Sequence, residues 1–380
     1  MTTTVAQLAA HLEALAPPAL QAPYDNSGLL VGEPATAITG VLCALDCTEE
    51  VIAEAVAAGC NVVVAHHPIV FGGLKRLTGR TYVERVVMSA LRQNVALYAC
   101  HTNLDSVLAR GVNGRIAERL GLRDVRVLAP TERALRKLAV YVPAEHADAV
   151  AEALWAAGAG RIGRYDRASF RSPGTGTFRP LAGARPAVGE APRGAGAGAD
   201  EHVAEVKLEV VVPRVLANAA LAAARRAHPY EEVAYDLYDV DGAHPDFGAG
   251  AVGELERALS AEEWLAALSE RMGLRYVKHT AAPGRPIRRV AVCGGAGGFL
   301  VGAARGAGAD AFVTADYKYH EFFDAEGALM ICDVGHYESE RFTIDVLYES
   351  IAERFGTFAA RKTRRDTNPV RLYLPPAAVH

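Results

Sequence analysis

The feature that most constrains this chain is an apolar, β-branched run that ends at two histidines and a proline, Val62-Val63-Val64-Ala65-His66-His67-Pro68. Such a run predicts a strand of a parallel sheet that is buried on both faces. In open sheets of this kind, ligands bind outside the carboxyl ends of the strands, which is where His66 and His67 lie. Neighbouring residues of an extended chain point to opposite sides, so the pair suits two adjacent ions better than one. A pair of surface loop histidines is the alternative, and this motif alone does not decide between them.

Length and composition set the class of protein. A chain of 380 residues exceeds one ordinary core, so we expect more than one domain. With 51% hydrophobic residues, 22% charged residues and a net charge of −4, the chain gives no electrostatic reason to expect nucleic acid or an acidic membrane as a partner. The six cysteines form no CxxC pair, which predicts reduced thiols and a cytoplasmic location. The first 17 residues predict an amphipathic helix and not a signal peptide, and no apolar run is long enough for a membrane span.

Two strand–helix–strand units follow the first helix. Residues 40–45 and 61–65 predict strands around a helix that begins after Thr48. Residues 82–93 then predict a helix and 95–100 a strand, which leads into His101 and Asp105. The two crossovers place both polar clusters at the same edge of one sheet.

The pattern changes from residue 128 onward. The alternation there predicts a small ferredoxin-like α+β domain with strands at 137–142, 202–212 and 233–240 and helices at 145–157 and 215–228. Residues 174–200 are dominated by Gly, Ala, Pro and Arg, which predicts a surface loop. We therefore expect an α/β fold, a three-layer α/β domain made of residues 1–127 and 281–380, interrupted by an inserted domain at 128–280.

The α/β pattern resumes after the insertion. We expect strands at 289–293, 311–314 and 328–332, a helix at 299–307, a long helix that opens after Asp333, and an edge strand at 370–374. His336 and Glu340 lie four residues apart at the start of that long helix, so both face the same way.

Three predicted strand ends thus carry metal-ligating side chains. They are His66 with His67, His101 with Asp105, and His336 with Glu340. Imidazole and carboxylate without thiolate suit zinc, manganese or iron and argue against a closed structural zinc site. We favour a centre of two metal ions over unconnected loop residues, because all three pairs lie at strand ends.

Two further features have competing interpretations. Gly294, Gly295, Gly297 and Gly298 resemble a phosphate-binding loop, although a tight turn without a ligand explains them equally well. Asp316 and His320 lie at another strand end and are partners that orient metal ligands, a proton-transfer pair or a solvated helix start. For His228 to Glu232, which could pass for a site, we favour a helix end and turn.

Together these motifs resemble the GTP cyclohydrolase I type 2 homologues, a family also described as dinuclear metal-centre proteins. The resemblance rests on Tyr24-Asp25-Asn26-Ser27-Gly28-Leu29, His66-His67-Pro68, His101-Thr102-Asn103-Leu104-Asp105, Thr314-Ala315-Asp316 with His320, and Gly335-His336-Tyr337-Glu338-Ser339-Glu340. It implies that His66, His67, Asp105, His336 and Glu340 are the metal ligands, with Glu340 bridging two ions and His101 beside them. It also implies a PII-like inserted domain and a homo-oligomer, a hexamer.

The leading hypothesis is a metal-dependent hydrolase that acts on a purine nucleotide, with zinc as the first choice of metal. His101, Asp316 or His320 would move protons, and the glycine run would hold a phosphate. One alternative is a metal-binding scaffold or regulator whose inserted domain senses a small ligand or a partner. The other is phosphoester hydrolysis by the same pair of metals.

Overall fold

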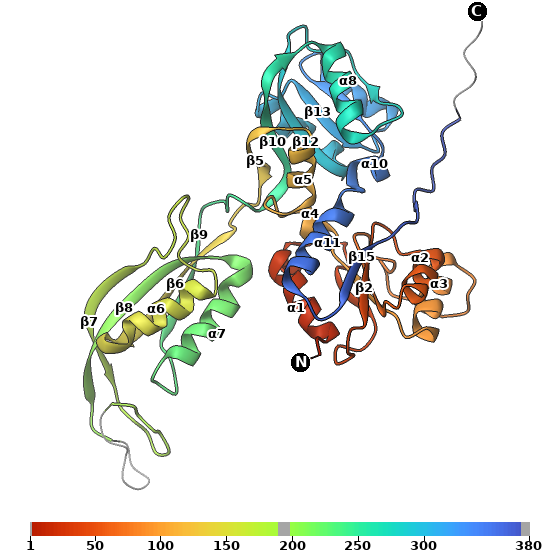
Figure 1. The fold of residues 1–380 in the computed structure, drawn as a ribbon. Coiled ribbons are helices and arrows are strands. Elements are labelled where there is room, and N and C mark those ends of the chain that lie inside the picture. The colour runs from red at the N-terminus through yellow and green to blue at the C-terminus, as the bar shows by residue number, and fades with distance from the viewer. Residues whose placement is uncertain (1, 189–197, 374–380) are drawn as a thin grey trace, which may run out of the picture. The chain divides into compact units, whose positions relative to one another are not determined.

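The computed structural model describes residues 2–188 and 198–373, and the chain divides into two compact units (Figure 1). One unit contains Met1–Ala129 and Asp246–His380, and the other is Pro130–Pro245. The inserted unit therefore ends at Pro245. We predicted an end near residue 280. Residues beyond Pro245 belong to the first unit because strand β10 (Gly248–Leu259) pairs with a strand of that unit. The next helix, α8 (Ala261–Met272), buries Trp264 completely in the core of the same unit.

The first sheet of the larger unit has the strand order β1-β4-β3-β2-β15. Its strands are β1 (Gly28–Val31), β2 (Gly40–Ala44), β3 (Val62–Ala65), β4 (Ala96–Ala99) and β15 (Ala359–Lys362). Strands β15, β2, β3 and β4 are parallel neighbours, and β1 is antiparallel to β4. Every residue of β2, β3 and β4 is buried, as their apolar runs predict. The crossover helices are α2 (Glu49–Ala57), capped by the Thr48 side chain, and α3 (Tyr82–Arg92).

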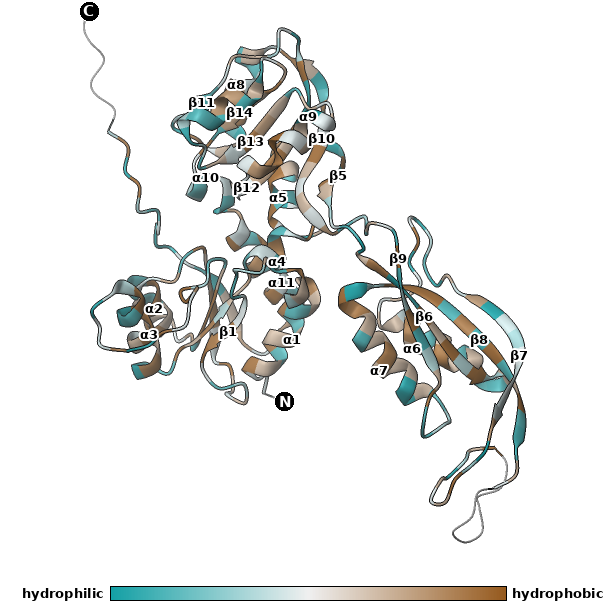
Figure 2. Cartoon of the chain, turned by 180° about the vertical axis from the view of Figure 1, so that it is seen from behind, coloured by the Kyte–Doolittle hydropathy of each residue, from teal (hydrophilic) through white to brown (hydrophobic). Residues whose placement is uncertain are grey.

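A second sheet has the order β11-β14-β13-β12-β10-β5. Its remaining strands are β5 (Arg123–Pro130), β11 (Lys278–His279), β12 (Ile287–Ala296), β13 (Ala311–Ala315) and β14 (Met330–Asp333). Strands β12, β13 and β14 are parallel and carry long hydrophobic stretches (Figure 2). The clusters that follow β3 and β4 thus lie at one edge of one sheet, as predicted, but β12, β13 and β14 belong to a second sheet. The two sets of parallel strands stay separate because β10 and β15, which the sequence did not reveal, pair with β12 and β2.

Helices connect the two sheets through one continuous hydrophobic core. The core contains Val62 and Tyr98 of the first sheet and Val290 and Val313 of the second. The other helices of this unit are α1 (Val5–Leu15), α4 (Thr102–Asp105), α5 (Val112–Arg119), α9 (Val301–Gly306), α10 (His336–Glu340) and α11 (Thr343–Arg354), with the short turns η1 (Pro18–Leu20), η4 (Gly298–Leu300) and η5 (Tyr319–Ala325).

Two predictions for the last part of the chain are wrong. The long helix after Asp333 is two helices, α10 and α11, separated at residues 341–342. The predicted edge strand at 370–374 is absent from residues 370–373, and Leu374 lies outside the described residues. The Val370 amide donates to the Asn368 side-chain oxygen over 3.0 Å, so it is not available for a sheet.

The inserted unit contains a four-stranded antiparallel sheet in the order β7-β8-β6-β9. Its elements are β6 (Leu135–Pro143), η2 (Ala144–His146), α6 (Ala147–Ala156), β7 (Phe170–Phe178), β8 (Glu201–Pro213), η3 (Arg214–Leu216), α7 (Ala217–Ala227) and β9 (Tyr235–Val240). This β-α-β-β-α-β succession with that strand order is the ferredoxin-like arrangement. Both helices pack on the sheet face that carries Leu138, Val140 and Val210.

Part of the predicted surface loop at 174–200 is a strand. Residues 174–178 end β7 and pair with β8, for example Gly176 with Val203. The glycine-rich composition hid this strand, because a strand partner supplies the order that local sequence does not. Residues 189–197 of the predicted loop lie outside the described residues.

Candidate metal centre

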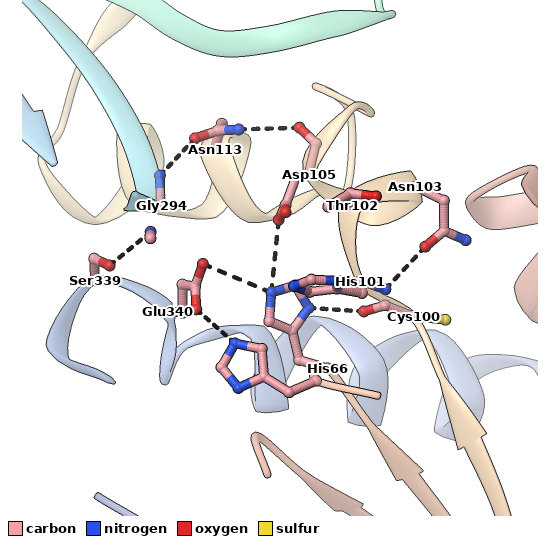
Figure 3. Close-up of polar contacts among 12 residues, drawn as sticks. His66, Cys100, His101, Thr102, Asn103, Asp105, Asn113, Gly294, Ser339 and Glu340 are labelled. Atoms are coloured by element: carbon pink, nitrogen blue, oxygen red, sulfur yellow. Dashed lines mark hydrogen bonds and ion pairs between the residues drawn. The ribbon is translucent and has the colours of Figure 1, made fainter. Parts of the chain in front are cut away.

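Polar side chains from both sheets of the larger unit converge at the carboxyl ends of their strands. His66 and His67 follow β3, and Asp105 ends helix α4, which follows β4. His336 and Glu340 begin and end α10, which follows β14. Figure 3 shows Asp105 and Glu340 approaching the His66 imidazole from two sides. The cluster therefore lies where the ends of two sheets meet, and not at one edge of a single sheet.

Glu340 lies in the middle of the cluster and is almost completely buried, with 3% of its surface exposed. Its Oε2 atom is 2.9 Å from Nε2 of His67 and 2.9 Å from Nε2 of His336. Its Oε1 atom is 3.8 Å from Nε2 of His66. Burial alone would raise the pKa of this carboxyl, but the surrounding imidazoles outweigh it and hold the pKa well below its usual range. Glu340 is thus an ionised carboxylate with one oxygen directed to each side of the cluster.

Every imidazole of the cluster is fixed through its Nδ1 atom. Four Nδ1–H groups each donate to an oxygen 2.7 Å away: His66 to the Cys100 carbonyl, His67 to Asp46, His101 to Asp25 and His336 to Asp316. An oxygen acceptor on Nδ1 orients the ring and directs Nε2 toward the ligand, which is the arrangement of metal-binding histidines.

Two buried atoms of the cluster have no hydrogen-bond partner among the described residues. They are Nε2 of His66 and Oδ1 of Asp105, which lie 3.6 Å apart. Burial, with the neighbouring Glu340 charge, raises the pKa of Asp105 to about 8. Unpaired buried polar atoms are rare in folded proteins and require an explanation. A cation between these donors would satisfy both atoms, so the residues fit a metal ion.

Three sets of side chains have ligand atoms close enough to hold a metal ion. They are His66, Asp105 and Glu340; His67, His336 and Glu340; and His66, His67 and His101. The sequence predicted all of these residues, and the structure brings them together. The first two sets share Glu340.

The electrostatics of the cluster favour positive charge. Burial lowers the pKa of His67, but its hydrogen bonds to Asp46 and Glu340 outweigh burial and raise the pKa to about 10. The bond to Glu340 raises the pKa of His336 to about 9. Both rings therefore carry protons on Nε2, the atom that a metal would use. Metal binding must displace those protons, so metal affinity rises with pH.

The glycine run has a role other than phosphate binding. The N–H groups of Gly294, Gly295 and Gly297 donate to side chains within the protein: to Asn113, Ser339 and Thr314, over 2.9–3.0 Å. The helix that follows is too short to attract an anion, because α9 has only six residues. A Cβ at Gly295 would overlap the Glu340 carboxylate. These glycines therefore let β12 approach α10 closely, which favours the tight turn over the phosphate-binding loop.

Two buried side chains fix the position of the ligands relative to this run. Asn113 accepts from the Gly294 amide and donates to the Asp105 carbonyl, both over 3.0 Å (Figure 3). Ser339 accepts from the Gly295 amide over 3.0 Å and donates to the His336 carbonyl over 2.8 Å. The helices that carry the ligands are therefore tied directly to strand β12.

Asp316 and His320 have different surroundings in the structure. Asp316 has a positive φ of 57° and orients His336, so it acts through that ring. His320 is exposed and its ring lies against Tyr319, at a centroid distance of 5.2 Å. Among the described residues no polar contact joins His320 to the cluster. The pairing of these two residues as proton carriers is thus not what the structure shows.

Two carboxylates to which sequence reasoning assigned no individual role hold the imidazoles. Asp25 accepts from His101 and, on its other oxygen, from the Thr102 amide over 3.0 Å, and these bonds hold its pKa below the usual range despite burial. Asp46 accepts from His67 and from the Thr367 hydroxyl, over 2.7 and 2.6 Å. Asp46 follows a buried strand end, β2, by two residues, and that signal would have found it.

A cavity of about 360 Å3 opens beside the cluster. Its lining includes His67 and His336 of the cluster and also Tyr276, Lys278 and Tyr337. Asn368, Pro369 and Val370 of the C-terminal segment also line it. The centre is therefore open to a small molecule on this side.

The fold and this centre define a mixed α/β protein with several sheets and a group of residues able to hold metal. The sequence model of the family described as Duf34/NIF3 (NGG1p interacting factor 3) matches residues 3–369. The chain belongs to this family, which confirms the resemblance found in the sequence.

Relatives carry the name of the family that the motifs indicated. A protein of Halalkalibacterium halodurans named GTP cyclohydrolase 1 type 2 homolog is 40% identical over 335 residues, which are 88% of this chain and 87% of the relative. A Bacillus subtilis protein of the same name is 36% identical over 373 residues, 96% of this chain and 97% of the relative. The crystal structure of a Bacillus cereus protein related to NIF3 is 33% identical, with a TM-score of 0.84 over 98% of this chain and 100% of that chain.

Two predictions from composition can be compared with the structure. All six cysteines are free thiols and buried. Within the described ranges, the structure contains no helix with the length and apolar character that crossing a membrane requires.

Proposed function

We propose that this protein is a hydrolase that depends on two divalent metal ions and acts on a purine nucleotide. The observation that carries the proposal is the position of Glu340. Its Oε2 atom faces His67 and His336, and its Oε1 atom faces His66, so one buried carboxylate serves two sets of ligands. A bridging carboxylate of this kind is typical of dinuclear centres.

The two proposed sites are His66, Asp105 and Glu340 on one side and His67, His336 and Glu340 on the other. Imidazole and carboxylate donors suit zinc, and also manganese or iron. Bound there, such ions would supply the Lewis acidity that hydrolysis at an electrophilic carbon, such as C8 of guanine, requires.

We assign one of two roles to His101, which are proton transfer and service as a further metal ligand. Its Nδ1 atom donates to Asp25, and a ring nitrogen of His101 lies within 4.8 Å of ring nitrogens of His66 and His67. Asp316 is a positioning residue for His336.

The substrate class rests on the names of the relatives and on the cavity beside the cluster. Tyr276 and Tyr337 offer aromatic surface to a heterocycle. Lys278 offers a positive charge to a phosphate, although its Nζ also lies 2.6 Å from Asp333.

The test begins with metal analysis of the purified chain. We expect two equivalents of transition metal per chain, and loss of metal in the variants His67→Ala and Glu340→Gln. His320→Ala is the matched control, because that imidazole is exposed and outside the cluster. Metal-loaded protein is then incubated with GTP and a panel of nucleotides. Turnover that survives Glu340→Gln would contradict the mechanism.

Two other functions are favoured by specific features. The inserted unit has its own hydrophobic core, which supports a metal-binding scaffold or regulator whose second unit senses a ligand. Full metal occupancy without turnover on any nucleotide would favour the scaffold or regulator.

A two-metal phosphoesterase would use the same residues, and product analysis distinguishes released phosphate from a ring-opened base.

The remaining implications of the resemblance stay predictions. They are a hexamer and a PII-like character of the inserted unit, and the cytoplasmic location inferred from the cysteines likewise stays a prediction. Light scattering on the purified chain tests the first.

A further inference from the structure

The inserted unit contains a cavity of about 660 Å3 that the metal centre does not use. Its aromatic lining is Tyr141, Phe178 and Tyr230, and its acidic lining is Glu205, Glu231 and Glu232. All of these residues belong to Pro130–Pro245. The cavity is therefore a property of this unit alone.

The segment from His228 to Glu232 holds Tyr230 in place. His228 is the C-cap of α7, as the sequence predicted, and is buried. Its Nδ1 atom accepts from the Tyr230 amide over 3.1 Å, so Nε2–H donates to the Tyr141 carbonyl, over 2.9 Å. The Tyr230 ring then lies edge-to-face with Phe178, at a centroid distance of 6.3 Å. The aromatic wall is thus fixed by backbone contacts, and is not a chance exposure.

Glu205 lies over the backbone of β7. Gly176 leaves the space for it, because a Cβ there would overlap the Glu205 carboxylate. Among the described residues no lysine or arginine pairs with Glu205. The buried Tyr230 hydroxyl has no hydrogen-bond partner there either. Burial, and then the close approach of the Glu205 carboxylate to this hydroxyl together with the carboxylate's charge, raise the pKa of Tyr230 to about 12, so the hydroxyl stays neutral.

Negative charge dominates the lining. Glu231 accepts from the Arg185 amide over 2.8 Å, which does not neutralise it, and Glu232 is exposed. Arg179 is the one guanidinium among the described lining residues, and its Nε atom lies 2.6 Å from Asp200. Carboxylates beside aromatic faces attract organic cations and repel phosphates.

We propose that this cavity binds a small organic cation, an ammonium group on an apolar or aromatic body. The ammonium lies against Glu205, and the body lies against Tyr230 and Phe178. This inference deepens the sensing alternative given above and does not depend on the hydrolase proposal. It also predicts that the nucleotide substrate does not bind here.

Isothermal titration of the full chain, held metal-free by a chelator, tests the proposal. The probes are tryptamine, its neutral analogue tryptophol, the anion indole-3-propionate, the aliphatic cations choline and putrescine, and GTP. We expect binding of tryptamine that is at least tenfold tighter than that of tryptophol, and no binding of the two anions. Because the metal centre is empty of metal throughout, failure here leaves the hydrolase proposal untouched.

Matched variants locate the site. Glu205→Gln and Gly176→Ala, which displaces the same carboxylate, should each weaken tryptamine binding at least tenfold. Glu209→Gln is the control, because Glu209 lies on the same strand, pairs with Lys137 and Lys207, and is outside the cavity. Absence of binding for every cation overturns the proposal. Equal loss in the control, or GTP binding that Arg179→Ala abolishes, also overturns it.

Discussion

Replacing Gly295 by alanine tests the metal centre without substituting a proposed ligand. Gly295 has a φ of +61°, and a Cβ there would lie 3.2 Å from Cε1 of His336 and 3.3 Å from Cδ of Glu340, overlapping Oε1 of Glu340. Ordinary contacts between such atoms are about 3.5–4.0 Å, so the carboxylate must move by on the order of 1 Å. That movement affects both proposed sites at once, because they share this side chain.

The Gly295→Ala substitution should lower both the free energy of unfolding and the metal affinity. An alanine in the left-handed region costs about 1–2 kcal/mol of unfolding free energy. Disturbed orientation of a ligand typically costs about 10–100-fold in metal affinity. Gly327→Ala separates the two, because Gly327 has a φ of +67° and a Cβ there meets nothing within 4 Å.

The assay combines urea unfolding of the metal-free protein with metal titration by calorimetry. Both variants should lose a similar unfolding free energy from the backbone, whereas only Gly295→Ala should lose metal affinity. If Gly295→Ala binds metal as tightly as Gly327→Ala does, Glu340 does not hold the metal as we infer.

Three other predictions follow from the same contacts. Asp46→Ala frees the Nδ1 atom of His67 and should weaken metal binding about 10–100-fold, as measured by calorimetry; unchanged affinity would remove Asp46 from the centre. Asn113→Leu leaves two buried backbone groups without their partners and should cost about 2–4 kcal/mol in urea unfolding, and a loss below 1 kcal/mol would contradict this. The pKa of His67 is raised from 6.5 to about 10, so its stabilising charge is present below pH 6.5 and lost as the pH rises toward 10. The pKa of Asp105 is raised from 3.8 to about 8, so its ionisation also lowers the free energy of unfolding as the pH rises toward 8. The metal-free protein should therefore unfold more easily at pH 9 than at pH 6, and a rise in stability over that range would refute the assignment.

The buried strands and their polar ends could be predicted from sequence because both depend on local patterns. Val62-Val63-Val64-Ala65 is a fully buried strand, and His66 and His67 follow it at the cluster. The i, i+4 spacing placed His336 and Glu340 on one side of a helix start, and both meet His67 there. These placements could be predicted because backbone geometry fixes the periodicity of side chains along a strand or helix.

Other parts were not predictable, because they depend on contacts between distant segments. Strand β10 and helix α8 were assigned to the inserted domain, since nothing local shows that β10 pairs with β12. For the glycine run the sequence left a phosphate-binding loop and a tight turn equally open, and only the structure shows that its amides donate to Asn113, Ser339 and Thr314. Asp25 was named only within a motif, and its bond to His101 spans 76 residues.

The sequence by itself determined which residues could gather as metal ligands, because strand ends and helix faces follow from local periodicity. Only the tertiary structure decided that these ends belong to two sheets, that one buried carboxylate, Glu340, lies between two sets of imidazoles, and that Asp46 and Asp25 hold the rings. The physical reason is that pairing of sheet edges and burial of charge depend on the whole fold, which no single segment encodes.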